Sequence, residues 1–307
     1  MEIQVRTSDC TLCGVCAEEC PFGAITIGEE GPEFLESCTL CGACVKVCPT
    51  EAIHIAGEGE ESPGHGNGEH AGVWVFAEQI DGYLAGVVRE LLGEGRNLAF
   101  QLGEPLACVL LGDEVDHLSS ELLEFGADQV YLATAPELRS YRDDLYSQVI
   151  EHVVRKHKPS IFLIGGTTNG RSLAPRVATQ LQTGLTADCT GFALDEDGNL
   201  LQTRPAFGGN LMATIRCPHH RPQMATVRPK VFQPARREPG RTGEVIRVVL
   251  PTLRPWARIL EVVKEESLGP NLGEADIVVS GGRGLGKPEQ FRMIEELAEA
   301  LGGAVGA

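Results

Sequence analysis

The sequence predicts three parts in one chain of 307 residues: a small α+β domain rich in cysteine, an α/β body, and the beginning of a second doubly wound domain. Three observations lead to this division. Eight of the 11 cysteines lie within the first 48 residues. From Val73 onward, strand-like apolar runs alternate with helix-like segments. Near the C-terminus, a strand-like run leads into a glycine-rich turn and a further helix.

The charge distribution sets the cysteine-rich part apart from the rest. The chain carries 43 acidic and 26 basic residues, a formal charge of -17, and residues 1–72 account for -11 of it. This excess of negative charge argues against a protein that binds nucleic acid or an anionic membrane. No apolar run reaches the roughly 18 residues of a membrane helix, and residues 1–9 lack the plan of a signal peptide. We therefore expect a cytoplasmic protein with no membrane span and no nucleic-acid partner.

Two runs of four cysteines share the spacing C-x2-C-x2-C-x3-C, and a proline follows each run, at Pro21 and Pro49. The runs are Cys10, Cys13, Cys16 and Cys20, and then Cys38, Cys41, Cys44 and Cys48. The second run repeats the first at an offset of 28 residues, so residues 1–57 contain an internal duplication. This is the spacing of bacterial two-cluster ferredoxins, in which three cysteines of a run bind one [4Fe-4S] cluster and the fourth binds the other.

The ferredoxin spacing predicts the ligands of both clusters. One set is Cys10, Cys13, Cys16 and Cys48, and the other is Cys38, Cys41, Cys44 and Cys20. Gly14 and Gly42 would let backbone amides approach the cluster sulfides. The alternatives are disulfides, which are rare in chains without an export signal, and zinc, whose cysteines usually come as two pairs. A domain this small, with few large apolar residues, needs such inorganic ligands to fold.

Residues 58–72 contain Gly, Glu, Ser and Pro but no large apolar side chain, which predicts a flexible linker. His65 and His70 lie in this linker. Two isolated histidines in a glycine-rich segment are more often solvated than metal-bound, so we assign them no metal.

The body, residues 73–258, alternates single strands with single helices. This order predicts a parallel sheet wound with helices, because a parallel return needs a crossover. The expected strands are 73–76, 107–111, 129–132 and 161–164, and the expected helices are one beginning near Tyr83 and those over 115–125, 145–157 and 170–181. Between Cys189 and Val249 the pattern changes to short strands, with DEDGN at 195–199 as a hairpin turn between 192–194 and 200–201, which adds short antiparallel strands to the fold.

The sequence GGTTN at 165–169 follows an expected strand and can cap the next helix. A ligand at that edge of the sheet would meet the amides of the helix N-terminus. Two interpretations stay open. Either a polar cofactor or partner subunit binds there, or the helix is simply well capped and Arg171 and Arg176 are solvated.

A strongly basic stretch runs from Arg204 to Arg258, where 11 basic residues face only Glu238 and Glu244, a local charge of +9. Aromatic residues for base stacking are sparse in this stretch, so nucleic acid is a weak interpretation. The basic residues would instead face a partner subunit, bind cofactor phosphates, or balance the chain's own acidic groups.

The last expected strand, Ala275–Ser280, runs into the glycine-rich turn 281–286, after which Lys287-Pro288 opens a helix. Such a turn lets backbone amides approach an anionic or planar ligand. The turn does not fit G-x-G-x-x-G, so its spacing alone is weak support for a dinucleotide site.

Three segments in this order, 165–190, 204–215 and 277–286, resemble the alpha subunit of electron-transferring flavoproteins, the family that includes the FixB proteins. The resemblance covers residues 73–307, and a two-cluster ferredoxin ahead of them is similar to the variant of anaerobic bacteria. It implies an electron-transfer subunit of an electron-bifurcating complex, rather than a stand-alone enzyme. The implied partners are a beta subunit with a second FAD and the NADH site, an acyl-CoA or lactate dehydrogenase, and an external ferredoxin.

The resemblance also implies FAD at the glycine-rich turn, with contacts from Gly281, Gly282, Arg283 and Gly284. Arg283 would lie against the flavin ring, where a fixed guanidinium favours the reduced anionic flavin. Residues 259–307 would be only a partial FAD-type domain, so we expect a truncated sequence. The alternative is a two-cluster ferredoxin relay fused to a docking scaffold that binds no flavin.

The remaining candidates carry no assigned chemistry. His219 and His220 lie among prolines and arginines and are expected in a loop rather than in a catalytic site. Cys108 lies in an apolar strand and is expected in the core. Cys189 and Cys217 have no cysteine near them in sequence.

Overall fold

A computed structural model describes residues 2–28, 31–35, 37–38, 43–56, 69–263, 272 and 275–307. The chain divides into two compact units, Met1–Gly66 and Asn67–Ala307. Of the linker expected over 58–72, only residues 69–72 are among those described, and His65 lies outside them.

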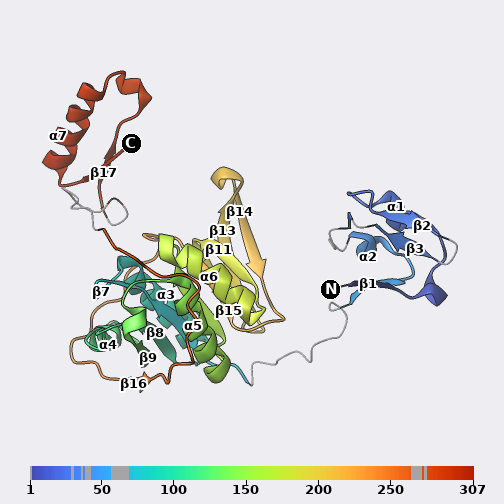
Figure 1. The fold of residues 1–307 in the computed structure, drawn as a ribbon, viewed down its shortest axis with the longest axis horizontal. Coiled ribbons are helices and arrows are strands. Elements are labelled where there is room, and N and C mark those ends of the chain that lie inside the picture. The colour runs from blue at the N-terminus through green and yellow to red at the C-terminus, as the bar shows by residue number, and fades with distance from the viewer. Residues whose placement is uncertain are drawn as a thin grey trace. The chain divides into compact units, whose positions relative to one another are not determined.

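The N-terminal unit repeats one motif (Figure 1, blue). In each half a short helix is followed by a strand. These are α1 (Val15–Glu18) and β2 (Ile25–Ile27), then α2 (Ala43–Val47) and β4 (Ile53–Ala56). The two short antiparallel ladders join β1 (Glu2–Val5) to β4 and β2 to β3 (Pro32–Phe34), and a 3-10 turn, η1 (Thr7–Asp9), follows β1. The unit has the α+β character expected from the duplication.

Seven parallel strands form the sheet of the body, in the order β11-β15-β10-β5-β8-β9-β16. They are β5 (Val73–Ala77), β8 (Leu106–Gly112), β9 (Gln129–Thr134), β10 (Ile161–Gly165), β11 (Leu185–Cys189), β15 (Gln223–Val227) and β16 (Glu244–Arg247). Every residue of β5, β8, β10 and β15 is buried, as in parallel sheets that are covered on both faces. The predicted wound parallel sheet is confirmed.

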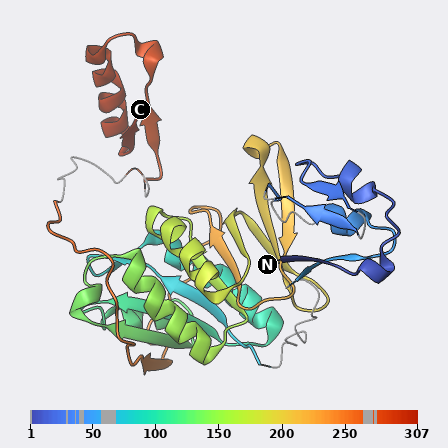
Figure 2. The ribbon, with the colours of Figure 1, turned by 45° about the vertical axis from the view of Figure 1, so that its right-hand side comes forward.

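Two helices cover each face of this sheet (Figure 2). On one face lie α3 (Gly86–Leu102) and α4 (Leu118–Glu124), and on the other lie α5 (Asp143–His157) and α6 (Thr168–Leu181). The helix expected from Tyr83 begins later, because Tyr83–Leu84 forms β7, which pairs with β6 (Gln79–Ile80). A 3-10 turn, η2 (Pro136–Leu138), follows β9.

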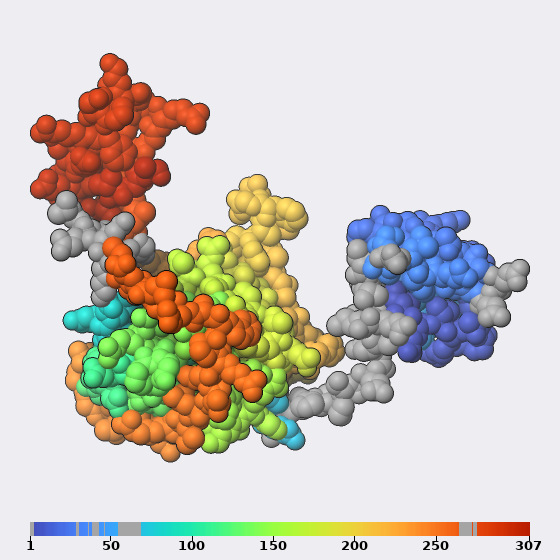
Figure 3. All heavy atoms as spheres, viewed as in Figure 1, coloured from blue at the N-terminus to red at the C-terminus, as the bar shows by residue number. Residues whose placement is uncertain are grey.

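A second, antiparallel sheet joins the body after β11. It contains β12 (Gly191–Leu194), β13 (Leu200–Ala206) and β14 (Leu211–Arg216), with β13 in the middle. The expected turn at 195–199 is confirmed, and the Asp195 carboxylate closes it by accepting the amides of Asp197 and Asn199. Strands β13 and β14 continue beyond β12, and their tip, the 3-10 turn η3 (Phe207–Gly209), stands clear of the body (Figure 3).

The segment 228–258, here named the strap, crosses the surface of the body after β15 (Figure 3, orange) and includes β16. Carboxylates of the body hold its backbone. Glu90 accepts the amides of Lys230, Val231 and Phe232, and Asp144 accepts the amide of Trp256 at 2.7 Å.

The last described part, residues 275–307, is one strand-helix-strand unit. Strands β17 (Val278–Ser280) and β18 (Ala304–Gly306) are parallel, and α7 (Arg292–Leu301) connects them. The helix expected from Pro288 begins as a 3-10 turn, η5 (Pro288–Phe291), and becomes α-helical only at Arg292. Among all the helices described, none has the length and apolar character needed to cross a bilayer.

Candidate cluster and flavin sites

Four cysteines from distant parts of the N-terminal unit line one small hollow. Cys10 and Cys13 come from the first cysteine loop, Cys16 from α1, and Cys48 from the residue after α2. Gly14 precedes α1 with a φ of 80°, a conformation that glycine adopts without strain, and so turns the loop into the helix. The structure therefore brings together the four residues that the spacing predicts for one cluster.

The second predicted set is seen in part. Cys44 is buried in α2, and Cys20 packs against the same small core. Burial raises the pKa of the Cys44 thiol, and negative charge on nearby Cys38 raises this pKa further. Cys41 lies outside the described residues. Three of the four predicted ligands thus belong to one neighbourhood.

The duplication extends to the hydrogen bonds on sulfur. The amide of Ala24 donates to Cys20 Sγ at 3.3 Å, and 28 residues later the amide of Ala52 donates to Cys48 Sγ at 3.3 Å. The amide of Ala24 lowers the pKa of the Cys20 thiol. At Cys48 burial opposes this effect, but bonds from Thr50 and Ala52 outweigh burial, and the pKa of this thiol is lowered as well. Both sites are therefore built for a thiolate.

The buried pair Cys16 and Cys44 behaves in the opposite way. Burial raises the pKa of the Cys16 thiol, as it does for Cys44. A bound metal removes such protons, because its positive charge stabilises the thiolate more than burial penalises it. These cysteines offer soft sulfur ligands that are partly shielded from water, and backbone amides donate hydrogen bonds to two of the sulfur atoms. Such a set of ligands fits iron-sulfur clusters.

Two further observations concern the alternatives to iron-sulfur clusters, which are disulfides and zinc. None of the ten cysteines that the structure describes forms a disulfide. Within the same described ranges, no group of three or more His, Cys, Asp or Glu side chains is placed so that it could hold a single metal ion.

The glycine-rich turn lies between β17 and α7, at the carboxyl end of a parallel strand. Gly281 packs tightly, since a Cβ there would lie 2.5 Å from Leu285 and 2.8 Å from Ile294. Gly282 and Gly284 instead border open space, with no atom within 4 Å of a Cβ placed on either. Arg283 is exposed between them, in the 3-10 turn η4 (Arg283–Leu285). An open turn with an exposed guanidinium fits a planar, anionic group such as FAD.

The N-terminus of α6 is occupied by the chain itself. Strand order reverses between β5 and β10, where ligands usually bind in wound sheets. There the Glu78 carboxylate, only 3% exposed, accepts bonds from Thr167 Oγ1 at 2.6 Å and Asn169 Nδ2 at 3.1 Å. Thr167 in turn caps the helix by accepting the Gly170 amide. Of the two interpretations of GGTTN, the well-capped helix is the one that this geometry supports.

Sequence reasoning missed Glu78, which is a functional-looking residue with a structural role. Burial raises the pKa of its carboxyl group, and the bonds from Thr167 and Asn169 only partly offset this. Its one signal in the sequence is an acidic residue directly after the apolar strand VWVFA. Of the two arginines expected to be solvated, Arg176 instead pairs with Asp143 at 3.0 Å.

Many residues of the basic stretch 204–258 balance the chain's own carboxylates. Arg241 contacts Asp128 at 2.9 Å, and Arg237 contacts Glu124 at 2.7 Å. Further internal ion pairs are Arg216 with Asp195, Arg228 with Asp188, and Arg247 with Asp116. These arginines therefore balance the chain's own acidic groups, which is the third of the three alternatives for this stretch.

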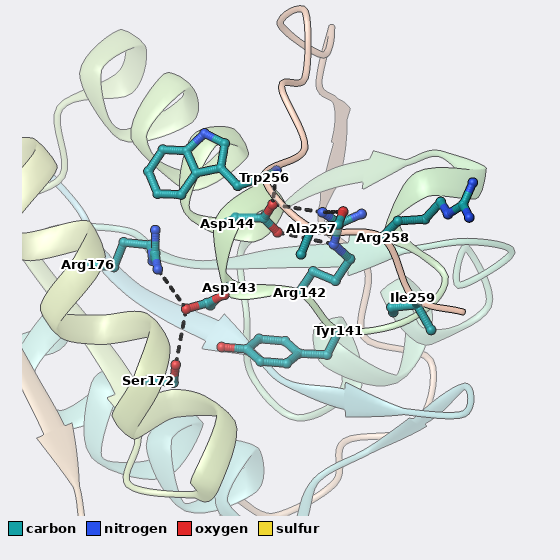
Figure 4. Close-up of a pocket in the computed structure, with 10 residues that line it drawn as sticks. All are labelled: Tyr141, Arg142, Asp143, Asp144, Ser172, Arg176, Trp256, Ala257, Arg258 and Ile259. Carbon is teal, nitrogen blue, oxygen red and sulfur yellow. Dashed lines mark hydrogen bonds and ion pairs between the residues drawn. The ribbon is translucent and has the colours of Figure 1, made fainter. Parts of the chain in front are cut away.

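A hollow of about 440 Å³ marks the end of the strap (Figure 4). The Trp256 ring lies beside Arg176, whose guanidinium carbon is 5.0 Å from the ring centre. Arg142 forms two bonds to Asp144, at 3.1 and 2.7 Å. Each carboxylate here has an arginine partner, and the Asp144 carboxylate and the Arg176 guanidinium both contact Trp256, so the hollow lies where the strap is anchored to the body.

The other candidates stay without assigned chemistry. His219 and His220 are exposed in the loop after β14. Cys108 and Cys189 are buried in the body, and burial raises the pKa of the Cys189 thiol to about 12. Burial likewise raises the pKa of the Cys217 thiol.

Comparison with known families agrees with this division. Residues 73–253 match the electron transfer flavoprotein domain, residues 271–307 the electron transfer flavoprotein FAD-binding domain, and residues 9–53 a 4Fe-4S dicluster domain. The family models thus place an iron-sulfur domain and an FAD-binding domain in one chain.

Individual proteins are similar over most of the chain. The alpha subunit of an electron transfer flavoprotein from Thermoanaerobacterium thermosaccharolyticum is 51% identical, over 78% of this chain and 73% of the relative. Protein FixB of Clostridium saccharobutylicum is 48% identical, over 77% and 71%. Subunit LctC of the lactate dehydrogenase (NAD(+),ferredoxin) of Acetobacterium woodii is 41% identical, over 77% and 57%. The chain belongs to the alpha-subunit (FixB) family of electron transfer flavoproteins, and its function is electron transfer.

Proposed function

We propose that this chain carries single electrons between FAD and two [4Fe-4S] clusters, as the alpha subunit of an electron-bifurcating flavoprotein complex. It would be an electron carrier rather than a stand-alone enzyme. In this proposal residues 1–57 are a ferredoxin domain, 58–72 a linker, 73–258 the body, and 259–307 part of an FAD-binding domain.

The observation that carries the proposal is the hollow lined by Cys10, Cys13, Cys16 and Cys48. Its cysteines come from both halves of the duplication, as the ligand exchange of two-cluster ferredoxins requires. The second cluster would be held by Cys38, Cys41, Cys44 and Cys20. When bound, such clusters supply one-electron chemistry. The amides of Ala24 and Ala52 would stabilise negative charge on the Cys20 and Cys48 sulfurs.

The glycine-rich turn supports the second cofactor. Gly281, Gly282 and Gly284 would let the backbone approach FAD, and Arg283 would lie against the flavin ring. A guanidinium there stabilises negative charge, so it would favour the reduced anionic flavin. The match of 271–307 to an FAD-binding domain favours this reading over a docking scaffold without flavin.

The relatives suggest the partners. One is a subunit of a lactate dehydrogenase (NAD(+),ferredoxin), and another, 41% identical, is the acryloyl-CoA reductase electron transfer subunit beta of Anaerotignum propionicum. We therefore propose a beta subunit that binds a second FAD and NADH, an acyl-CoA or lactate dehydrogenase, and an external ferredoxin as partners.

The test is iron, acid-labile sulfide and flavin per chain after anaerobic purification with the beta subunit. We expect about eight iron atoms per chain. Cys48→Ser should lose about half of them, because Cys48 serves only one cluster. Arg283→Ala should leave the iron unchanged and destabilise the anionic flavin semiquinone in a redox titration, whereas the exposed helix residue changed in Arg292→Ala should not.

The flavin content and the iron content of Cys48→Ser separate the proposal from its alternatives. Eight iron atoms without flavin would replace the proposal with the ferredoxin relay on a docking scaffold. An iron content unaffected by Cys48→Ser would refute the proposed ligand set.

A further inference from the structure

The two halves of the N-terminal unit differ beside one cluster ligand. We infer that the Thr50 hydroxyl raises the reduction potential of the cluster that Cys48 helps to hold above that of the cluster that Cys20 helps to hold. The inference rests on the proposed function for the two clusters themselves, and it adds the residue that sets their order. Thr50 is then a positioning residue, which acts through the sulfur of Cys48.

The backbone treats the two sulfurs alike. The amide of Ala24 donates to Cys20 Sγ and the amide of Ala52 donates to Cys48 Sγ, each at 3.3 Å. Because these donors occupy equivalent places in the two halves, they stabilise negative charge on the two sulfurs to a similar extent. A difference between the sulfurs therefore has to be sought in the side chains around them.

The side chains two residues after these cysteines are not alike. Thr50 Oγ1 lies 3.7 Å from Cys48 Sγ, within hydrogen-bond distance for sulfur. A thiolate has no proton to donate, so the hydroxyl donates to it. The residue in the equivalent place after Cys20 is Phe22, which is 53% exposed and whose side chain has no polar hydrogen. Position 50 thus supplies a donor that position 22 cannot supply.

The same threonine lies at the site of one cluster only. Thr50 lines the small hollow together with Cys10, Cys13, Cys16 and Cys48. On reduction a cluster takes up one electron, and its thiolate ligands share the added negative charge. A hydrogen bond to one of those sulfurs stabilises the reduced form more than the oxidised form, so it raises the reduction potential.

A second difference between the halves acts in the same direction. Glu19 directly precedes Cys20, whereas the residue that precedes Cys48 is Val47. A carboxylate near Cys20 opposes further negative charge there, so it lowers the potential of the cluster that Cys20 helps to hold. Glu19 is exposed, and water and salt screen its charge. We therefore assign the larger part of the difference to Thr50.

The order of the potentials determines where electrons reside. A tenfold preference corresponds to about 59 mV for a one-electron couple. With such a preference, a first electron resides on the cluster of Cys48, and only a second electron reduces the cluster of Cys20. The cluster of Cys20 is then the stronger reductant, and in the proposed complex it is the one suited to reduce an external ferredoxin.

The test is a redox titration of the full chain with the beta subunit, in which electron paramagnetic resonance follows the reduced clusters. The unmodified chain should show two potentials at least about 59 mV apart. Thr50→Val should lower the higher potential by about 59 mV, a tenfold change, and leave the lower one in place. Thr50→Ser keeps the hydroxyl and should restore the unmodified titration.

Thr11→Val is the matched control. Thr11 lines the same hollow, but its hydroxyl has no hydrogen bond to sulfur in the described part of the chain. The same change of threonine to valine at this position should therefore shift neither potential.

Phe22→Thr makes the reciprocal change in the other half. A hydroxyl at this position should raise the lower potential and narrow the gap between the two clusters. All these variants should keep about eight iron atoms per chain, so that a shift does not reflect a lost cluster. If Thr50→Val loses iron, the titration of Phe22→Thr decides the question.

Two results would overturn the inference and leave the proposed function intact. One is a titration of Thr50→Val that equals that of Thr11→Val, with about eight iron atoms in both. The other is a single shared potential for the two clusters of the unmodified chain. An unmodified chain with far fewer than about eight iron atoms would instead contradict the proposed function as well.

Discussion

Among the described residues of the N-terminal unit, the apolar core cluster has four buried members, and two of them are cysteines, Cys16 and Cys44. In the body, by contrast, a sheet is buried between two clusters of mainly aliphatic side chains. Ordering each residue costs about 1–2 kcal/mol of backbone entropy, whatever the size of the unit. The body offsets this cost by apolar burial, whereas the small unit has too little apolar surface and depends on its thiols. Under the proposed function, the comparison teaches that cysteine has opposite roles in the two regions, a cluster ligand in one and a small apolar residue in the other.

The largest effects are expected when one buried cysteine is changed to serine in each of the two regions. Cys16→Ser should remove one cluster, about four iron atoms, and destabilise residues 2–56 while the body keeps its melting temperature. Cys108→Ser should keep all the iron and lower the stability of the body by about 1–3 kcal/mol. The reason is that position 108 is fully buried, so the hydroxyl of the new serine would lose its water without gaining a hydrogen-bond partner evolved for it. Iron analysis and region-resolved hydrogen exchange measure both effects. A body that melts earlier in Cys16→Ser would show that the two regions are not independent.

A medium effect on the stability of the body is expected at Asp128, whose charged carboxylate accepts several hydrogen bonds. Asp128 accepts bonds from the Leu106 amide at 2.9 Å, from Arg96 at 2.8 Å and from Arg241 at 2.9 Å. Burial opposes the charge of Asp128, but these bonds outweigh burial and lower the pKa of its carboxyl group below the ordinary 3.8. Asp128→Asn should cost about 2 kcal/mol at pH 7, with the iron content unchanged.

The pH dependence follows from the sign of that shift. Because the folded pKa of Asp128 lies below the unfolded one, the stabilisation is complete at neutral pH and is lost as the pH falls through the folded pKa. The difference between Asp128→Asn and the unmodified chain in urea unfolding should therefore shrink toward acid pH. Glu296→Gln, which breaks an exposed pair with Arg292, is the control and should change stability by less than about 0.5 kcal/mol.

The smallest effect is expected at Glu78, where the shift has the opposite sign. The pKa of this carboxyl group is raised above 4.5, so its contribution to stability is complete below pH 4.5 and is lost as the pH rises through the folded pKa. Relative to the unmodified chain, Glu78→Gln should thus gain about 1 kcal/mol between acid and neutral pH, the size of one buried hydrogen bond. Urea unfolding over this range measures the slope. A slope of the same sign as for Asp128→Asn would mean that a cation compensates Glu78.

Local patterns in the sequence were sufficient for much of this structure. The cysteine spacing predicted the four residues around the hollow, because the ligands of one cluster must reach one point in space. The alternation of apolar strands and helices predicted the parallel sheet, and DEDGN predicted the turn that Asp195 closes. Each of these signals lies in a short, continuous stretch of chain.

The features that were missed depend on residues far apart in the sequence. Glu78 bonds to Thr167, 89 residues away, and Arg241 pairs with Asp128, 113 residues away. No local pattern distinguishes such an arginine from one that faces a partner subunit. The start of α3 was placed early for a different reason, since Tyr83–Leu84 pairs with Gln79–Ile80 in a hairpin whose two-residue strands are too short to show a periodic pattern.

The strap has a mechanical consequence. Its anchors are arranged in series along the surface of the body, from Glu90 at the beginning to Asp144 near the end. A pull from the C-terminal side would therefore load the bonds at Arg254, Trp256 and Ala257 first, and the earlier anchors only after these had opened. The strap would peel from α5 one anchor at a time, so tension would be absorbed at the surface before it reached the buried sheet.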